Sequence, residues 1–131
     1  MPARYGDHVG SLVVFSVDVR RLANFYGAVL DVRPTDEGSG DIRLVNEREE
    51  VLVHSIPARI ARTIVVSVPP EPRDGSALKP VFDVASLGVA LEAVRAQGGV
   101  ITDRSFSIDG LARHDVLDPD GNVIQLRSRR P

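Results

Sequence analysis

The 131-residue sequence contains no cysteine, so disulfide bonds, thiolate catalysis and cysteine-based metal sites are excluded. No stretch approaches the roughly 18 consecutive apolar residues that a membrane-spanning helix requires. Residues 1–10 also lack the apolar run of a secretion signal. We therefore expect a cytoplasmic protein without a membrane partner.

The sequence has little excess charge of either sign. Its 16 Lys and Arg residues nearly balance 18 Asp and Glu residues, and the formal net charge of −2 gives no bulk attraction to nucleic acid. Among the basic residues only Lys79 is a lysine, and we interpret the basic run at residues 127–130 as a solvated chain end. With 43% hydrophobic residues, the sequence predicts one globular domain over residues 1–131.

The clearest local pattern is a strand followed by a helix in the second half of the chain. Residues 79–84 alternate as a half-buried strand does. Ser86 then begins a helix predicted over residues 86–97, which Gly98 and Gly99 end.

The first half of the chain carries the same pattern. Residues 11–17 predict a strand and residues 18–30 a helix that Asp18 caps. We match Phe15 to Phe82, 67 positions later. The chain is therefore expected to contain two copies of one unit.

Three further strands complete each copy, so that each reads β-α-β-β-β. The predicted strands are residues 32–35, 42–45 and 51–55 in the first copy, and 100–102, 112–117 and 122–127 in the second, with a loop at 103–111 and a hairpin turn at 118–122. Between the copies we expect a helical turn at residues 58–62 and a short strand at 63–68. The predicted fold class is α+β, with module one at about 11–56, a linker at 57–78 and module two at 79–128.

Residues 14–19 and 25–26 resemble the first module of the vicinal oxygen chelate superfamily, and residues 82–99 and 118–126 resemble its second module. This superfamily contains glyoxalase I, bleomycin-resistance proteins and extradiol dioxygenases. The resemblance implies two tandem modules whose sheets form an open, curved cleft for a small molecule, commonly in a homodimer. Asp31 departs from the pattern, because the family usually has glycine after the first helix.

Some members of this superfamily hold a divalent metal ion with histidine and glutamate ligands from the first and last strands of the modules. The resemblance places these four positions at Leu12 or Ser11, Val53, Lys79 and Gln125. Alkyl groups and a protonated ammonium cannot ligate a metal, and an amide offers one weak oxygen. We therefore expect no metal of the family type and no cofactor. A shift of one residue at Val53 would bring in His54, which alone does not make a site.

Assigning Phe15 and Phe82 to the helix side of the sheets predicts which side chains face the cleft. The predicted cleft is mainly apolar with a few polar groups, as small-molecule sites tend to be. By alternation its residues are Leu12, Val14, Ser16, Val53, Ser55, Lys79, Val81, Asp83, Gln125 and Arg127, and His54 is added because it ends its strand at the expected cleft mouth.

Lys79 is the candidate catalytic residue, and two interpretations of it stay open. It either meets a carboxylate or phenolate of a ligand, with amine chemistry as a minor variant, or it pairs with Asp83 or reaches solvent. Glu47 and Asp115 are further candidate acids, although no two carboxylates are placed well enough to assign acid and base roles.

The leading hypothesis is a metal-independent, glyoxalase-like or bleomycin-resistance-like homodimer that binds a small, largely apolar molecule. The alternative is an enzyme of the superfamily, a lyase, isomerase or dioxygenase, with shifted metal ligands or chemistry at Lys79. A third hypothesis is a regulatory module with an empty cleft.

Overall fold

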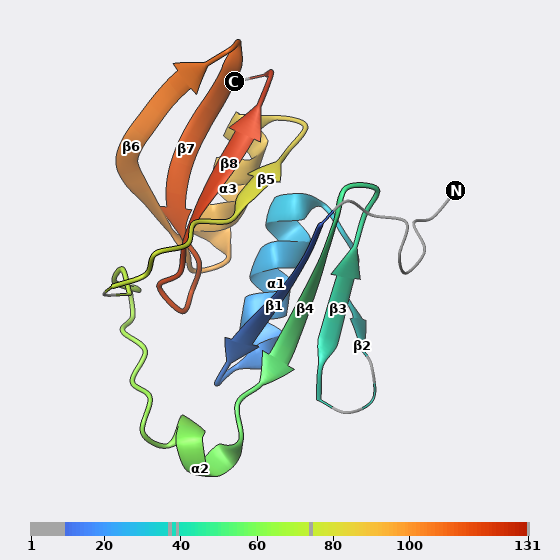
Figure 1. Cartoon of the computed structure of the whole chain (residues 1–131), viewed down its shortest axis with the longest axis vertical. Helices are drawn as coiled ribbons and strands as arrows, with labels where there is room; N and C mark the ends of the chain where they lie inside the picture. The colour runs from blue at the N-terminus through green and yellow to red at the C-terminus, as the bar shows by residue number, and fades with distance from the viewer. Residues whose placement is uncertain (1–9, 37, 39, 74, 131) are drawn as a thin grey trace.

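The computed structural model describes residues 10–36, 38, 40–73 and 75–130 and contains two four-stranded sheets (Figure 1). The first sheet has the order β1-β4-β3-β2 and the second the order β5-β8-β7-β6. In each sheet the first and last strands of the module pair in parallel, and the other pairs are antiparallel. The predicted α+β fold with two equivalent modules is therefore confirmed.

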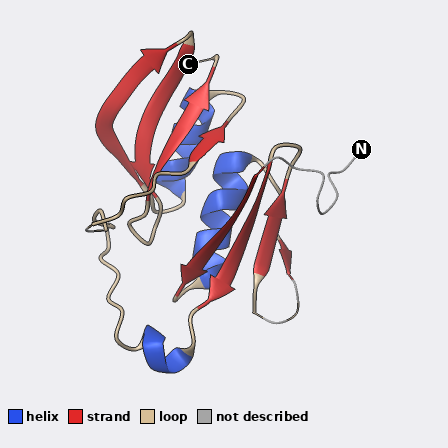
Figure 2. Cartoon of the chain, viewed as in Figure 1, coloured by secondary structure: helices blue, strands red, loops and turns tan. Residues whose placement is uncertain are grey.

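Module one consists of β1–β4 with one helix, and module two consists of β5–β8 with another. The elements of module one are β1 (Gly10–Ser16), α1 (Val19–Leu30), β2 (Thr35–Asp36), β3 (Ile42–Val45) and β4 (Glu49–Ser55). The elements of module two are β5 (Val81–Asp83), α3 (Leu87–Ala96), β6 (Val100–Ile108), β7 (Leu111–Leu117) and β8 (Val123–Ser128). Figure 2 shows both helices behind the strands, so each sheet keeps one open face. Of the described helices, none has the length and apolar character needed to cross a membrane.

Helix α1 begins and ends at aspartates. The Asp18 side chain accepts a hydrogen bond from the backbone N–H of Arg21, as predicted for its cap. The helix ends at Asp31, whose φ of 56° is left-handed. Glycine adopts that conformation most easily, and Asp31 adopts it here although the resemblance led us to expect glycine.

The two modules share one hydrophobic core. The ring of Tyr26 packs edge-on against Phe25 of its own helix and against Phe82 of β5. Tyr26 Oη also donates a hydrogen bond to Asp118 Oδ2 at 2.7 Å, in the turn before β8. Gly99 lets the end of α3 approach this core, because a Cβ there would lie 2.6 Å from the Phe25 ring.

Asp118 organises the hairpin turn that the sequence predicted between β7 and β8. Its Oδ1 accepts hydrogen bonds from the backbone N–H groups of Asp120 and Asn122. Burial raises the pKa of the Asp118 carboxyl, and burial together with that carboxyl raises the pKa of Tyr26. Tyr26 is therefore a protonated donor at neutral pH.

Two sequence predictions of secondary structure are wrong, and the strand predicted at residues 32–35 is reduced to β2 at Thr35–Asp36. Residues 63–68 form no strand, and Val65 among them is 91% exposed with no neighbouring strand to pair with. Residues 103–108 continue β6 instead of forming a loop, because Asp109 and Gly110 both adopt positive φ and close a hairpin onto β7. Asp-Gly is a strong hairpin signal, and it was overlooked in the sequence.

The segment between the modules begins with α2 (Ala58–Ala61), close to the helical turn predicted at residues 58–62. The described residues that follow, up to Pro80, form no helix or strand. Arg73 attaches the segment to module two, since its backbone N–H donates to Gly121 O and its Nε to Asp120 O. The linker thus supports the same turn that Tyr26 contacts.

Replacing Tyr26 with phenylalanine removes the hydrogen-bond donor to Asp118 and keeps the ring. We expect the free energy of unfolding to fall by about 1–2 kcal/mol, because a buried carboxylate loses one of its partners while Asn122 remains. Urea denaturation measures the change, and an unaltered m-value serves as the check that the fold is native. An unchanged midpoint would show that this contact does not hold the modules together.

Candidate functional site

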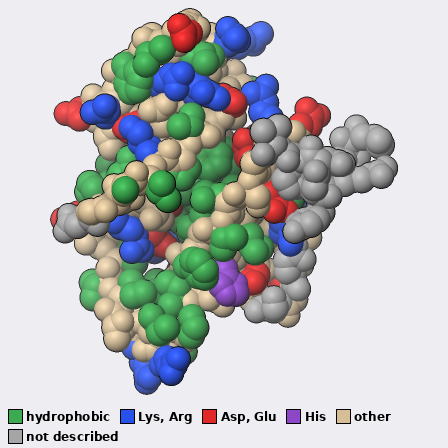
Figure 3. All heavy atoms as spheres, viewed as in Figure 1, with side chains coloured by type: hydrophobic (Ala, Val, Ile, Leu, Met, Phe, Trp, Pro, Cys, Tyr) green, Lys and Arg blue, Asp and Glu red, His purple; other side chains and the backbone are tan. Residues whose placement is uncertain are grey.

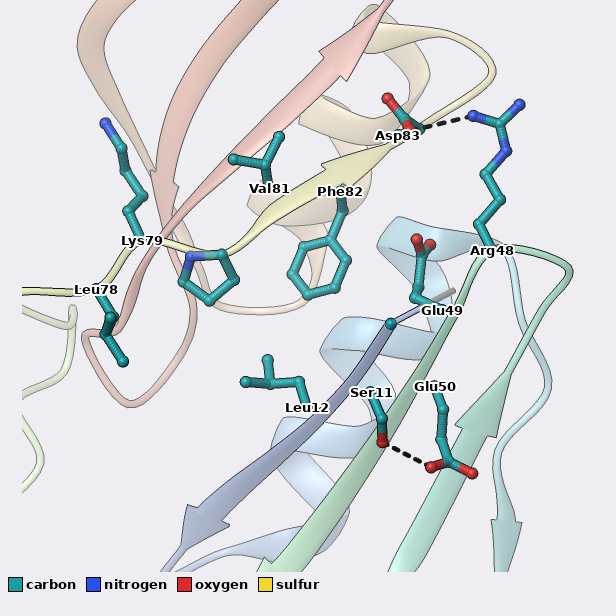
Figure 4. Close-up of a pocket in the computed structure, with 12 residues that line it drawn as sticks. Ser11, Leu12, Arg48, Glu49, Glu50, Leu78, Lys79, Val81, Phe82 and Asp83 are labelled. Carbon is teal, nitrogen blue, oxygen red and sulfur yellow. Dashed lines mark hydrogen bonds and ion pairs between the residues drawn. The ribbon is translucent and has the colours of Figure 1, made fainter. Parts of the chain in front are cut away.

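A cavity of about 700 Å³ lies where the edge strands β1 and β5 of the two modules meet. We call it the junction cavity (Figure 4). Its apolar lining comes from Leu12, Leu78, Pro80, Val81 and Phe82, and its polar lining from Ser11, Arg48, Glu49, Glu50, Lys79 and Asp83. Figure 3 shows hydrophobic side chains gathered at the centre of this face, between the modules. An apolar space with a charged rim suits a small organic molecule.

In module two, the strand faces lie as the alternation predicted. Phe82 and Leu126 are buried in the core, so their neighbours Val81, Asp83 and Gln125 turn to the open face. Arg127, paired in register with Asp83, lies on the same face.

In module one, the predicted faces are wrong. Val53 is 0% exposed and lies in the hydrophobic core, and Leu12 and Val14 pack against that core from the neighbouring strand. Phe15, assigned to the helix side, is 56% exposed on the open face. Of these predicted cleft residues, Leu12 still lines the junction cavity, because it lies at its edge.

The error has a simple cause. The helix caps Asp18 and Ser86 are 68 positions apart (86 − 18), so Val14, and not Phe15, corresponds to Phe82 (82 − 14 = 68). A shift of one residue exchanges the two faces of a strand.

The remaining predicted residues of module one also lie away from the junction cavity. Ser16 is buried, and its Oγ accepts a hydrogen bond from the backbone N–H of Asp18. Ser55 is exposed at the end of β4. His54 lies on the open face, with Nδ1 2.7 Å from Asp41 Oδ2 and its ring edge-on to Phe15.

Lys79 is held by a carboxylate that the sequence did not pair with it. Its Nζ lies 2.9 Å from Oδ2 of Asp115, whose residue is only 3% exposed. Gln125 Nε2 donates to the other Asp115 oxygen at 3.1 Å, and Arg104 Nε lies 3.4 Å from Oδ2. Arg113 Nη1 in turn donates to Gln125 Oε1. We call these five side chains the Asp115 network.

Asp83 pairs with arginines, and the predicted alternative of a Lys79–Asp83 pair is therefore wrong. Arg127 donates to both Asp83 oxygens, at 2.6 and 3.1 Å, and Arg48 of module one lies 3.1 Å from Oδ2. These bonds, that of Arg127 first, lower the pKa of Asp83. The Arg48–Asp83 pair, drawn dashed in Figure 4, crosses from one module to the other.

Sequence reasoning missed three residues of the cavity rim. It placed Arg48, Glu49 and Glu50 in a charged turn, whereas β4 begins at Glu49. Burial raises the pKa of Glu49, and Glu50 Oε1 accepts a hydrogen bond from Ser11. The start of β1 could have indicated this, because Gly10 and Ser11 pair in parallel with Glu49 and Glu50. A strand predicted to begin near residue 11 therefore implies that β4 begins before Val51.

The metal positions implied by the resemblance can now be tested against the structure. Val81 pairs with Gln125, and the equivalent pair in module one is Val13 with Leu52. The four positions are therefore Ser11, Leu52, Lys79 and Gln125.

This donor set does not fit a divalent ion. Leu52 has no donor atom, Lys79 is engaged by Asp115, and both polar ends of Gln125 are already bonded. Within the described ranges of the chain, no three His, Asp or Glu side chains gather closely enough to hold a metal.

The pairing of Asp83 with Arg127 predicts a pH dependence. A lowered pKa means that the pair stabilises the fold above the ordinary value of 3.8 and that this stabilisation is lost as pH falls below it. Near neutral pH we expect the free energy of unfolding of wild type to exceed that of Asp83→Asn by under about 1 kcal/mol, because the pair is partly exposed. In acid we expect the two free energies to become equal. Thermal unfolding from about pH 7 to about pH 2.5 measures it. Asp103→Asn, at an exposed site, is the control, and a gap independent of pH would contradict the assignment.

The comparisons with known proteins agree with this architecture. A family model described as the Glyoxalase/Bleomycin resistance protein/Dioxygenase superfamily matches residues 7–126. A glyoxalase/bleomycin resistance protein from Albidiferax ferrireducens T118 is 21% identical with a TM-score of 0.66, over 92% of this chain and 97% of that one. The fosfomycin resistance protein FosX from Mesorhizobium loti is 13% identical with a TM-score of 0.60, over 96% and 93%. Comparison with curated proteins gives no match. The chain therefore belongs to the Glyoxalase/Bleomycin resistance protein/Dioxygenase superfamily.

Proposed function

We propose that this protein binds a small, largely apolar molecule in the junction cavity without a metal of the family type. The observation that carries the proposal is the cavity itself, with five apolar residues lining about 700 Å³. Transfer of apolar ligand surface from water into such a space supplies the binding free energy. The paired side chains of Arg48 and Asp83 at the rim then orient a polar group of the ligand.

The Asp115 network supports the metal-independent part of the proposal. A buried carboxylate needs a cation, and in this protein Lys79 and Arg104 provide the positive charge. A bound divalent ion would compete with these side chains for the same oxygens. The site is already neutralised by the protein's own residues.

The alternative of an enzyme receives less support from the geometry. Chemistry at Lys79 requires a free amine, whereas its Nζ is held by Asp115 at 2.9 Å. Shifted metal ligands require a cluster of donors, and the described part of the chain has none. Sequestration of the bound molecule needs neither.

Apolar residues on the open faces support a homodimer. Val13 is 50% exposed and Phe15 is 56% exposed, and both lie on the open face of the first sheet. Covering such residues with a second copy would remove apolar surface from water. We place this dimer in the cytoplasm, as the sequence suggested, and that location remains a prediction.

Ligand binding is tested with N-phenyl-1-naphthylamine, a neutral apolar probe whose fluorescence rises in apolar surroundings. Val81→Glu introduces a charge into the junction cavity, and we expect it to weaken binding by about tenfold or more. Val89→Glu is the matched control, because Val89 is exposed on α3 and does not line the cavity. Both variants are compared with wild type after treatment with a chelator.

Two outcomes would contradict the proposal. Equal loss of binding in both variants would show that the probe does not occupy the junction cavity. Loss of binding on chelation, together with stoichiometric metal in untreated protein by elemental analysis, would show that the site depends on a metal.

The dimer is tested by sedimentation velocity. We expect wild type to sediment as a dimer and Phe15→Lys to shift toward monomer, because the new charge would be buried in the interface. Val89→Lys should remain dimeric, since that side chain lies on α3, on the other side of the sheet. A monomeric wild type at about 100 µM would contradict the proposal, since a standard interface gives much tighter association.

A further inference from the structure

A second hollow, of about 370 Å³, lies beside the junction cavity at the end of β5. Arg127 of β8 and the following Arg129 and Arg130 line it, together with Arg48 and Asp83, which also line the junction cavity. We call it the arginine pocket. Figure 3 shows Lys and Arg side chains gathered over the part of the molecule that holds module two.

The residues that line this pocket are not balanced in charge. Four arginines and one aspartate line it, Asp83 is already bonded by Arg127 and Arg48, and the nearby Glu49 interacts with Arg48 at the edge of the junction cavity. In residues 10–130, with the gaps stated above, neither Arg129 nor Arg130 has a carboxylate partner. The pocket therefore carries uncompensated positive charge.

The chain end that carries these arginines is docked onto the start of α3. Leu87 N–H donates to the carbonyl oxygen of Arg130 at 3.1 Å, and Arg130 N–H donates to Ser128 Oγ at 3.0 Å. Ser128 Oγ donates in turn to Ala85 O at 3.2 Å. The interpretation of residues 127–130 as a merely solvated end is therefore too simple, because their backbone is fixed beside a hollow.

We propose that the arginine pocket binds a small oxyanion, the phosphate or carboxylate group of a metabolite. Guanidinium groups present paired N–H donors that match the oxygens of either group. A hollow of about 370 Å³ has room for a small anion, and the formal net charge of −2 gives no bulk attraction to nucleic acid. The proposal is independent of the junction cavity, whose proposed ligand is apolar.

Calorimetric titration of the full chain with pyrophosphate and with citrate, at low ionic strength, tests this site. We expect one anion to bind per chain and Arg129→Gln/Arg130→Gln to weaken binding by about tenfold or more, because two charge-assisted hydrogen bonds are lost. Arg59→Gln/Arg62→Gln is the matched control, since it removes the same charge from exposed positions around α2. Preference for pyrophosphate assigns a phosphate ligand, and preference for citrate a carboxylate.

Equal weakening of anion binding in both double variants would overturn the proposal. It would show that the anion responds to the overall charge of the protein and not to the arginine pocket. Absence of binding of either anion to wild type at millimolar concentration would overturn it as well. A single-stranded oligonucleotide that binds more tightly than pyrophosphate, and depends on Arg129 and Arg130, would replace the small anion with a nucleic acid partner. Binding of N-phenyl-1-naphthylamine should be unchanged in both double variants, which separates this test from that of the junction cavity.

Discussion

The two modules are linked by the hydrogen bond that Tyr26 donates to Asp118. It joins the helix of module one to a turn of module two inside a shared core, where an unpaired hydroxyl or carboxylate would be costly. Arg21 adds a second link to the same turn through Asp120, at 2.8 Å. Because this packing holds the edges of β1 and β5 near each other, the junction cavity is a consequence of the module contact.

The open faces of the sheets carry carboxylates that are neutralised from within. Asp115 is paired with Lys79, Asp83 with Arg127 and Arg48, and Glu50 with Arg43. A carboxylate already bound by protein cations is a poor ligand for a metal, because the ion must first displace them. In this protein the open faces therefore present an apolar cavity and, beside it, a hollow lined by arginines. This is the physical basis of the proposed function.

The sequence was sufficient for the fold because strand alternation, the caps Asp18 and Ser86 and the turn at Asp118 are local signals. It also predicted correctly which side chains of β5 and β8 turn to the core and which turn to the open face. It failed in module one because Phe15 looked like the counterpart of Phe82, whereas an exposed aromatic is a poor marker of the core side. The pairing of Arg48 with Asp83 was beyond local patterns, since it depends on how the modules pack.

The most direct measurement is a titration of chelator-treated, methyl-labelled protein with N-phenyl-1-naphthylamine, followed by NMR. If the junction cavity binds apolar molecules without a metal, the methyl signals of Leu12, Leu78 and Val81 will shift most. Shifts confined to Val13 on the open face, or shifts that appear only after a divalent metal is added, would contradict the account.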